Sequence, residues 1–332
     1  MKLTQFIKTG VVAAVIATAA LGLAHVATAQ TSNEQSQTAN TLRVSPVRSD
    51  VTVNPGDTSI INVTVSNPSD AKVTVRPIQN DFVAGDEDGT PAIILEEGES
   101  ADSHSLKQFL SPLETVEIEP GESKTVEVEV TIPEDAEAGG YYGVIRFAPS
   151  TPDGGGEVNT SASVASIVLL TVTGDAAEKL DLTEFLVKQH DRVKSFFTSG
   201  DGISTAIRFQ NDGQVHAGPF GAITLTKGDT IVQEIDFNNK AQRDMVLPDS
   251  ARRWSVPLEG IDGFGKYTVH ATFTYGASNK SIETSESFWV IPKMIIVLFA
   301  AALLVIVAVI GAVIYRLRGT KGSVKKSTKR RR

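Results

Sequence analysis

The densest group of carboxylates lies in a short loop bounded by glycines, Gly85-Asp86-Glu87-Asp88-Gly89, with Asp81 upstream and Glu96-Glu97 downstream. Hard cations bind clustered carboxylate and carbonyl oxygens, and glycines permit the sharp turn that such a loop needs. Asp86 and Asp88 are therefore the candidate metal ligands. The twelve-residue spacing of a calcium loop is not met, however, and the alternative is a solvated turn between two strands. We predict no metal.

No other residues form a recognisable catalytic constellation. The absence of cysteine excludes disulfides, thiolate metal sites and cysteine nucleophiles. The motifs G-x-S-x-G, H-E-x-x-H and Walker A are also absent. Four histidines follow residue 29, and because they are far apart we expect them to be solvated or incidental: His104, His190, His216 and His270. We predict no catalytic residue, no cofactor and no enzyme. A fold that brought His190 or His216 close to two acids in a cleft would favour an enzyme instead.

Charge divides the chain into three parts. Residues 30–292 hold all 39 acidic residues against 19 basic ones, whereas residues 293–332 hold ten basic residues and no acid. A strongly acidic middle is a poor binder of nucleic acid, because phosphate contacts need a basic face. We predict no nucleic-acid partner.

The two ends predict export and anchoring. Residues 1–29 combine Lys2 and Lys8, a short apolar stretch and Ala27-Thr28-Ala29, which is typical of a cleaved signal peptide. An uncleaved N-terminal anchor is the alternative, although the apolar stretch is short for a membrane span. Residues 30–41 are polar, and we expect a disordered linker there.

Residues 294–315 are apolar throughout and long enough for a transmembrane helix. The basic residues of 316–332 follow directly, and positive charge beside a span stays in the cytoplasm. We therefore predict a single-pass membrane protein with its N-terminal ectodomain outside and a basic cytoplasmic tail that contacts anionic lipid. Trp289, just before the span, is expected at the lipid interface. Trp254 could be a surface anchor or a core residue.

From Leu42 to the span the hydrophobic pattern has period two, which predicts strands with one buried and one solvated face. In 126–132, Val126, Val128, Val130 and Ile132 alternate with Glu127, Glu129 and Thr131. Turn signals such as Pro120-Gly121-Glu122 separate these segments. The sequence predicts an all-β ectodomain of two immunoglobulin-like antiparallel β-sandwiches, at 42–175 and 180–291.

The two halves share a weak sequence similarity. A glycine-containing turn precedes Tyr141 in the first half and Tyr267 in the second, each at the start of a late strand. Immunoglobulin-like sandwiches use such a tyrosine to donate a hydrogen bond back across the corner. The alternative is that both are ordinary half-buried strand residues.

These segments resemble the WxL-interacting proteins of Gram-positive bacteria. The first half resembles their peptidoglycan-binding domain at residues 65–75 and 118–147, and the second half resembles their host-binding domain at residues 208–225, 245–258 and 264–276. The loop between Asn80 and Leu95 departs from the family pattern. The resemblance implies a surface protein that binds cell-wall peptidoglycan or partner surface proteins, with no catalytic residue to transfer.

Two further classes stay open. A structural spacer would hold another surface component away from the membrane without a ligand of its own. A periplasmic pilus chaperone has a similar sandwich architecture, but the C-terminal span disfavours that class because such chaperones are soluble. The acidic ectodomain would attract cationic partners, yet a local patch or strand edge is the more usual binding surface of a sandwich.

Overall fold

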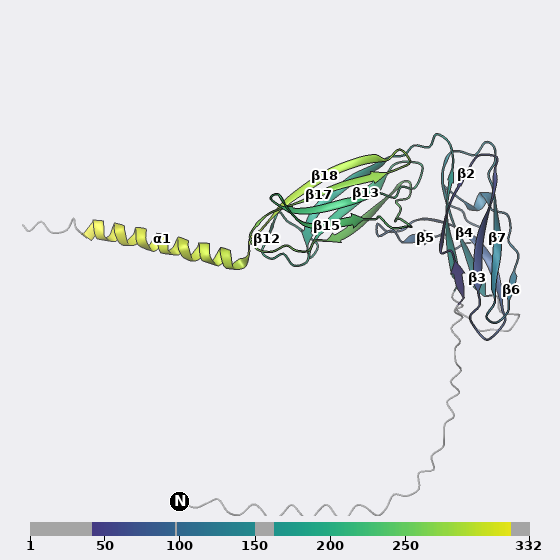
Figure 1. The fold of residues 1–332 in the computed structure, drawn as a ribbon, viewed down its shortest axis with the longest axis horizontal. Coiled ribbons are helices and arrows are strands. Elements are labelled where there is room, and N and C mark those ends of the chain that lie inside the picture. The colour runs from purple at the N-terminus through teal and green to yellow at the C-terminus, as the bar shows by residue number, and fades with distance from the viewer. Residues whose placement is uncertain (1–41, 97, 150–162, 320–332) are drawn as a thin grey trace, which may run out of the picture. The chain divides into compact units, whose positions relative to one another are not determined.

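The computed structural model describes residues 42–96, 98–149 and 163–319. The predicted signal peptide (1–29), the linker (30–41) and the tail beyond residue 319 lie outside the described residues. The described chain is mostly β, with sandwich-like sheets followed by one C-terminal helix (Figure 1). This confirms the predicted fold class at that level.

Residues 42–172, here called the N-terminal region, contain two sheets. The smaller has the order β1-β3-β7, and the larger has the order β2-β9-β8-β4-β5, with β6 also paired to β4. The strands are β1 (Arg43–Ser45), β2 (Arg48–Val53), β3 (Thr58–Ser66), β4 (Val73–Ala84), β5 (Pro91–Ile93), β6 (Val116–Ile118), β7 (Ser123–Thr131), β8 (Gly139–Pro149) and β9 (Val164–Val172), and a short 3₁₀ helix, η1 (Lys107–Phe109), precedes β6.

The β3–β7 pair follows the predicted alternation. Val128 is fully buried opposite Ile61, whereas Glu127 is exposed opposite Asn62. On the solvated face, paired hydroxyls interact across the strands, as between Thr64 and Thr125 at 2.9 Å. The period-two pattern therefore predicted correctly which residues of this strand face the core.

The first strand changes sheets, which the sequence did not reveal. Its first part, β1, pairs with β3, and after Pro46 its second part, β2, runs parallel to β9 with six residue pairs. This pairing is parallel, whereas the other pairings of the same sheet are antiparallel. Two strands joined by a tight turn cannot pair in this way, so sequence signals for hairpins do not detect it.

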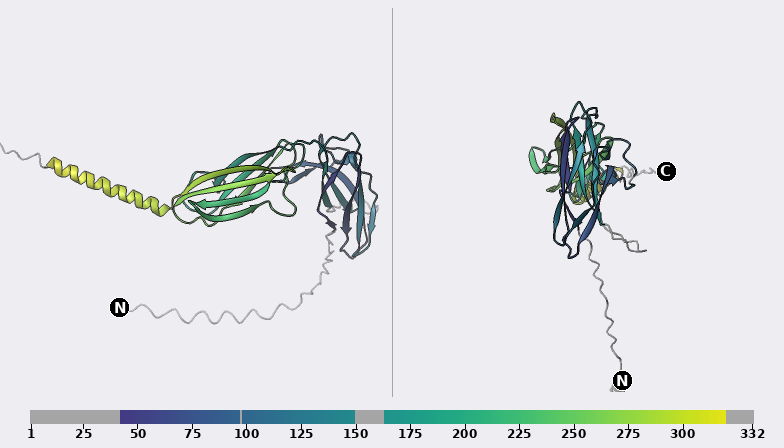
Figure 2. Two further views of the ribbon diagram at one scale, coloured as in Figure 1. Left: turned by 45° about the horizontal axis from the view of Figure 1, so that its top comes forward. Right: turned by 90° about the vertical axis from the view of Figure 1, so that its right-hand side faces the viewer.

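Residues 180–290, here called the C-terminal region, contain a second pair of sheets (Figure 2). Their strand orders are β11-β10-β13-β16 and β12-β18-β17-β14-β15. The strands are β10 (Leu180–Gln189), β11 (Arg192–Val193), β12 (Phe196–Phe197), β13 (Ile203–Asn211), β14 (Phe220–Lys227), β15 (Thr230–Phe237), β16 (Ser250–Pro257), β17 (Gly265–Tyr275) and β18 (Lys280–Val290). All pairings here are antiparallel except that of β12 with β18.

Each region has its own hydrophobic core. The N-terminal core is almost entirely aliphatic, with Phe147 as its one fully buried aromatic side chain. The C-terminal core is built around aromatic rings. Trp254 packs against this core, which agrees with the second of the two alternatives given for that residue. A third, smaller cluster draws on both regions, with Phe82, Tyr142 and Leu169 buried against Met245 and Leu247. The two regions are therefore packed on one another.

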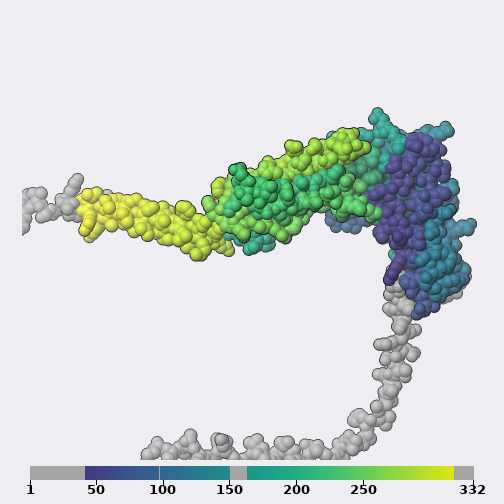
Figure 3. Space-filling view, in the orientation of Figure 1, coloured from purple at the N-terminus to yellow at the C-terminus, as the bar shows by residue number. Residues whose placement is uncertain are grey.

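The C-terminal helix, α1 (Lys293–Gly319), begins three residues after β18 ends. Its segment Lys293–Leu317 is long and apolar enough to cross a membrane, with a mean hydropathy of 3.2 in its most apolar window. Side chains from Ile296 to Leu317 are exposed, as the space-filling view shows (Figure 3). A helix of this composition has no polar face to present to water.

Candidate binding site

Two buried residues at the end of β4 organise the loop that follows. The Asp81 carboxylate is fully buried and accepts hydrogen bonds from the backbone N–H of Ala101 at 3.0 Å and of Lys107 at 2.9 Å. The neighbouring Asn80 donates to the carbonyl of Ile94 and accepts from Arg146 Nε at 2.9 Å. Asp81 thus has a structural role, because its oxygens are used in holding the segment that carries His104.

That segment separates two open hollows, of about 560 Å³ and about 460 Å³, which lie on either side of Ser103 and His104. His104 adopts a left-handed backbone conformation (φ 59°), and its Nδ1 lies 2.6 Å from the carbonyl oxygen of Gly140. This contact fixes the imidazole between two hollows. We call them the wall groove, lined mainly by residues 102–141, and the junction cavity, which lies between the two regions.

The wall groove combines aromatic rings with carboxylates. Phe109 and Tyr141 are half-buried and meet edge to face, with ring centroids 4.9 Å apart. The carboxylates of Asp102, Asp135 and Glu137 also line it. Such a surface can pack against a sugar or peptide and accept hydrogen bonds from hydroxyl, amide or ammonium groups.

Tyr141 is held by the corner that the sequence suggested. Its hydroxyl donates to the backbone carbonyl of Glu137 at 2.9 Å, and Tyr267 donates to the carbonyl of Asp262 in the equivalent place of the C-terminal region. Both tyrosines therefore bond back a few residues upstream, as tyrosine corners do. In the N-terminal region this bond also fixes one face of the wall groove.

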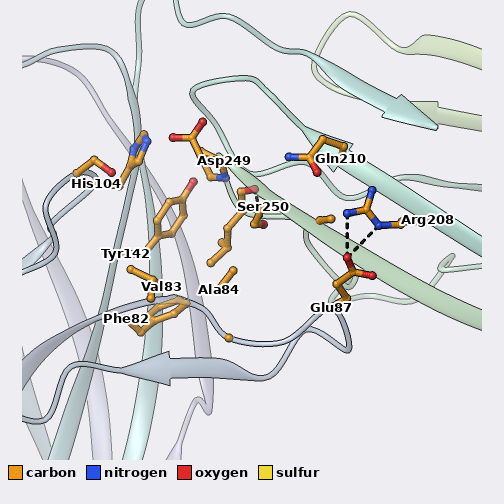
Figure 4. A pocket seen from close by; sticks show the side chains of 15 residues that line it. Phe82, Val83, Ala84, Glu87, His104, Tyr142, Arg208, Gln210, Asp249 and Ser250 are labelled. Carbon is orange, nitrogen blue, oxygen red and sulfur yellow. Dashed lines mark hydrogen bonds and ion pairs between the residues drawn. The ribbon is translucent and has the colours of Figure 1, made fainter. Parts of the chain in front are cut away.

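The acidic loop that suggested a cation site contacts the C-terminal region instead (Figure 4). Glu87 accepts two hydrogen bonds from Arg208, at 3.0 and 2.8 Å, and also pairs with Arg253 at 3.3 Å. The backbone carbonyl of Glu87 accepts from the N–H of Arg253 at 2.6 Å. The Arg208 guanidinium holds the pKa of Glu87 below its usual range. The loop thus links the two regions.

The two candidate metal ligands flank Glu87 in this loop. Asp88 accepts a hydrogen bond from the N–H of Thr90 at 2.8 Å, which lowers its pKa, while the Asp86 carbonyl accepts from the N–H of Gly89. Within the described residues, no three His, Cys, Asp or Glu side chains are grouped as metal ligands. The geometry is that of a turn, and the absence of a metal at Asp86 and Asp88 stays a prediction.

Tyr142 and His216 meet at the junction cavity. The hydroxyl of Tyr142 accepts from the backbone N–H of His216 at 2.9 Å and lies 3.3 Å from its Nδ1. Desolvation lowers the pKa of His216 to about 4. At neutral pH the imidazole is therefore uncharged, and its Nδ1 can accept a hydrogen bond from the Tyr142 hydroxyl. This hydroxyl then has one hydrogen-bond donor and one acceptor as partners.

The other histidines lie apart. His270 is exposed on β17, as the alternation predicted, and His190 is exposed in the turn after β10. The enclosure of His216 was not predicted, because its partner Tyr142 is 74 residues away in sequence. Adjacent aromatic residues on one strand, Tyr141 and Tyr142, were the available signal, since neighbours on a strand face opposite sides.

Comparison with known proteins supports the first half of the predicted resemblance. Residues 48–148 match the family model described as WxL Interacting Protein, peptidoglycan binding domain. Over these residues the chain is similar to that domain of the WxL-interacting proteins. The match contains Asp81, the acidic loop and most of the wall groove. It ends before the C-terminal region, whose resemblance to the host-binding domain stays a prediction.

No curated protein matches the chain in sequence. Among solved structures, the class 5 fimbriae chaperone CfaA is 14% identical, with a TM-score of 0.38 over 76% of this chain and 99% of that chain. The chaperone DraB of E. coli is 16% identical, with a TM-score of 0.30 over 75% and 96%. CupB2 of Pseudomonas aeruginosa is 11% identical, with a TM-score of 0.32 over 74% and 99%. Likeness at this level says nothing about the ligand of this chain.

Proposed function

We propose that this protein is a membrane-anchored bacterial surface protein that binds peptidoglycan through the wall groove and is not an enzyme. The observation that carries the proposal is the match of residues 48–148 to a peptidoglycan-binding domain, since those residues build most of the groove. The groove also suits this polymer, which presents sugar rings, hydroxyls and amides. Aromatic rings pack against the sugars, and carboxylates accept from their polar groups.

Retention of the detergent-solubilised full chain on purified cell-wall sacculi tests the proposal. The double substitution Asp135→Asn and Glu137→Gln keeps the shape of the groove but removes two charged acceptors. We expect it to weaken retention about tenfold, which corresponds to about 1.4 kcal/mol. Asp70→Asn, at an exposed carboxylate outside the groove, is the matched control and should bind as the unaltered chain does.

The outcomes separate the alternatives. Equal retention of the groove variant and the control would place binding on another face. Failure of the unaltered chain to bind sacculi would favour the structural spacer.

The two regions are proposed to be separate immunoglobulin-like domains, at 42–175 and 180–291. Their separate cores and the tyrosine corner in each support this assignment. The C-terminal domain would then present a contact surface for partner proteins, which is what its resemblance to a host-binding domain implies.

The proposed topology places α1 across the membrane, with both domains outside and the basic tail in the cytoplasm. The uncharged span and the ten basic residues of 293–332 support it. Protease added to cells with a permeabilised wall should remove the β-regions and leave a fragment with α1 and the tail. Digestion of the β-regions only after lysis would contradict this orientation.

A further inference from the structure

Three exposed aromatic side chains gather at the end of the C-terminal region from which α1 emerges. Phe196 is 62% exposed, Phe264 is 50% exposed and Trp289 is 38% exposed. Phe196 lies on β12, Trp289 lies near the end of β18, and Phe264 directly precedes β17. We call these three residues the aromatic end patch.

The register of the sheet places these residues side by side. Phe196 is the partner of Trp289 in the parallel β12–β18 pair, and Lys266 is the partner of Trp289 on β17. Partners in a ladder point to the same face of the sheet, so the side chains of Phe196, Trp289 and Lys266 form one row. The Phe264 and Trp289 rings are 5.8 Å apart.

The alternation shows that the exposure of this row is built into the fold. The next residue pair in the same ladder, Phe197 and Val290, is almost completely buried. The sheet thus has its core on one face at this end and an aromatic row on the other. Exposed aromatic residues in a contiguous group mark a contact surface in a soluble region.

The chain itself indicates what covers this patch. Trp289 lies four residues before Lys293, the first residue of α1, and four extended residues reach at most about 14 Å. Trp289 is therefore tethered within about 14 Å of the start of the apolar helix, close to the membrane interface. Aromatic side chains favour that layer because they combine an apolar ring with a polar or polarisable edge.

The lysines at this end of the C-terminal region also favour contact with a lipid surface. Residues 30–292 hold 39 acidic and 19 basic residues, which disfavours their approach to anionic lipid. At the patch, however, Lys266 lies beside Trp289, and the Lys227 side chain lies against Gly265. Lys293 follows at the start of the helix. These ammonium groups can pair with lipid phosphates.

We propose that Phe196, Phe264 and Trp289 insert into the headgroup layer of the bilayer that α1 crosses and so seat the C-terminal region on the membrane. This inference rests on the proposed anchoring by α1. It adds a second, peripheral contact, which a spanning helix on a free linker would lack.

A single-tryptophan reporter in the full chain tests the proposal. Trp254→Phe and Trp289→Phe remove the native indoles, and Phe264→Trp places one indole in the patch. The variant is reconstituted into vesicles of phosphatidylcholine with about one quarter phosphatidylglycerol, with and without bromine on the upper acyl chain. We expect brominated lipid to quench the reporter about twofold, because the indole lies at the interface. Ile60→Trp in the same background, at an exposed position of the N-terminal region, is the control and should not be quenched.

Alkaline extraction of the same vesicles separates the two claims. A chain that resists extraction but whose Phe264→Trp reporter is no more quenched than the control would overturn the patch alone. A chain that alkali removes would overturn the anchoring and the patch together. Phe196→Trp, on the exposed side of β12, is a second reporter should the first variant fail to fold, and the same quenching is expected of it.

Discussion

In the N-terminal region, Asn67 follows β3 and is almost completely buried, and its amide donates to the carbonyls of Ala71, Ile118 and Glu119. In the C-terminal region, Asn211 ends β13 and is fully buried, and its amide donates to the carbonyls of Val215 and Val246. A tyrosine corner completes each region. The polar devices that shape the turns are thus repeated in both regions.

The cores and surfaces around these devices differ. The N-terminal core is aliphatic, and the region leaves a polar groove open beside its corner. The C-terminal core is aromatic, and at its corner end the region exposes Phe264 and Trp289. The comparison teaches that the same turn architecture can carry unrelated surfaces. Function in such regions has to be inferred from the surface and not from the fold.

The largest effect is expected from placing a charge in either core. Val128→Asp and Val269→Asp each bury an unpaired carboxylate, because both valines are fully buried, and each should destabilise its region by about 4 kcal/mol or more. Their exposed neighbours are the controls, and Glu127→Lys and His270→Lys should stay within about 0.5 kcal/mol. Thermal unfolding measures both pairs. Equal losses at Val128 and Glu127 would show that the register is wrong.

The junction should be less stable in acid. The pKa of His216 is about 4 in the folded chain, below its ordinary 6.5, so the unfolded chain binds the proton more tightly. The free energy of unfolding is therefore highest above about pH 6.5. It falls as the pH approaches 4, by up to about 3 kcal/mol. Denaturant unfolding at several pH values measures this loss. His216→Gln should flatten this part of the pH profile, whereas His270→Gln should leave it unchanged.

The two buried asparagines test whether the repeated turns contribute equally. Asn67→Ala removes the donor from three carbonyls and Asn211→Ala from two, and we expect losses of about 3 and 2 kcal/mol. Urea unfolding of each variant gives the comparison. A smaller loss at Asn67 than at Asn211 would contradict the idea that the number of orphaned carbonyls sets the cost.

The smallest effect is expected at the tyrosine corners. Tyr141→Phe and Tyr267→Phe each remove one hydroxyl that donates to a backbone carbonyl, worth about 1 kcal/mol. Tyr267 is almost completely buried and Tyr141 is half-buried, so the loss should be greater at Tyr267. Melting temperatures of the two variants decide this, and a larger loss at Tyr141 would show that burial does not rank the corners.

Sequence alone predicted the local features well. Alternation identified the faces of β7 and β17, and glycine-containing turns indicated both corner tyrosines, because these signals involve residues close together in the chain. The contacts of Glu87 with Arg208 and of Tyr142 with His216 could not be predicted in this way. Each contact joins residues more than 70 positions apart, and the local sequence of either segment does not identify the distant residue that it contacts. The acidic loop shows the limit, since its composition fits a cation as well as it fits two arginines.

The position of β9 has a mechanical consequence. It is the last strand of the N-terminal region and lies between β2, with six residue pairs, and β8, with nine. In the proposed topology α1 lies in the membrane, so a pull on α1 that reaches the N-terminal region enters it at Val172, the C-terminal end of this strand. A pull along the strand axis loads both ladders in shear, so the hydrogen bonds on both sides of β9 share the load. A strand paired on both sides along its length therefore resists being drawn out of its sheet more strongly than an edge strand such as β2 does.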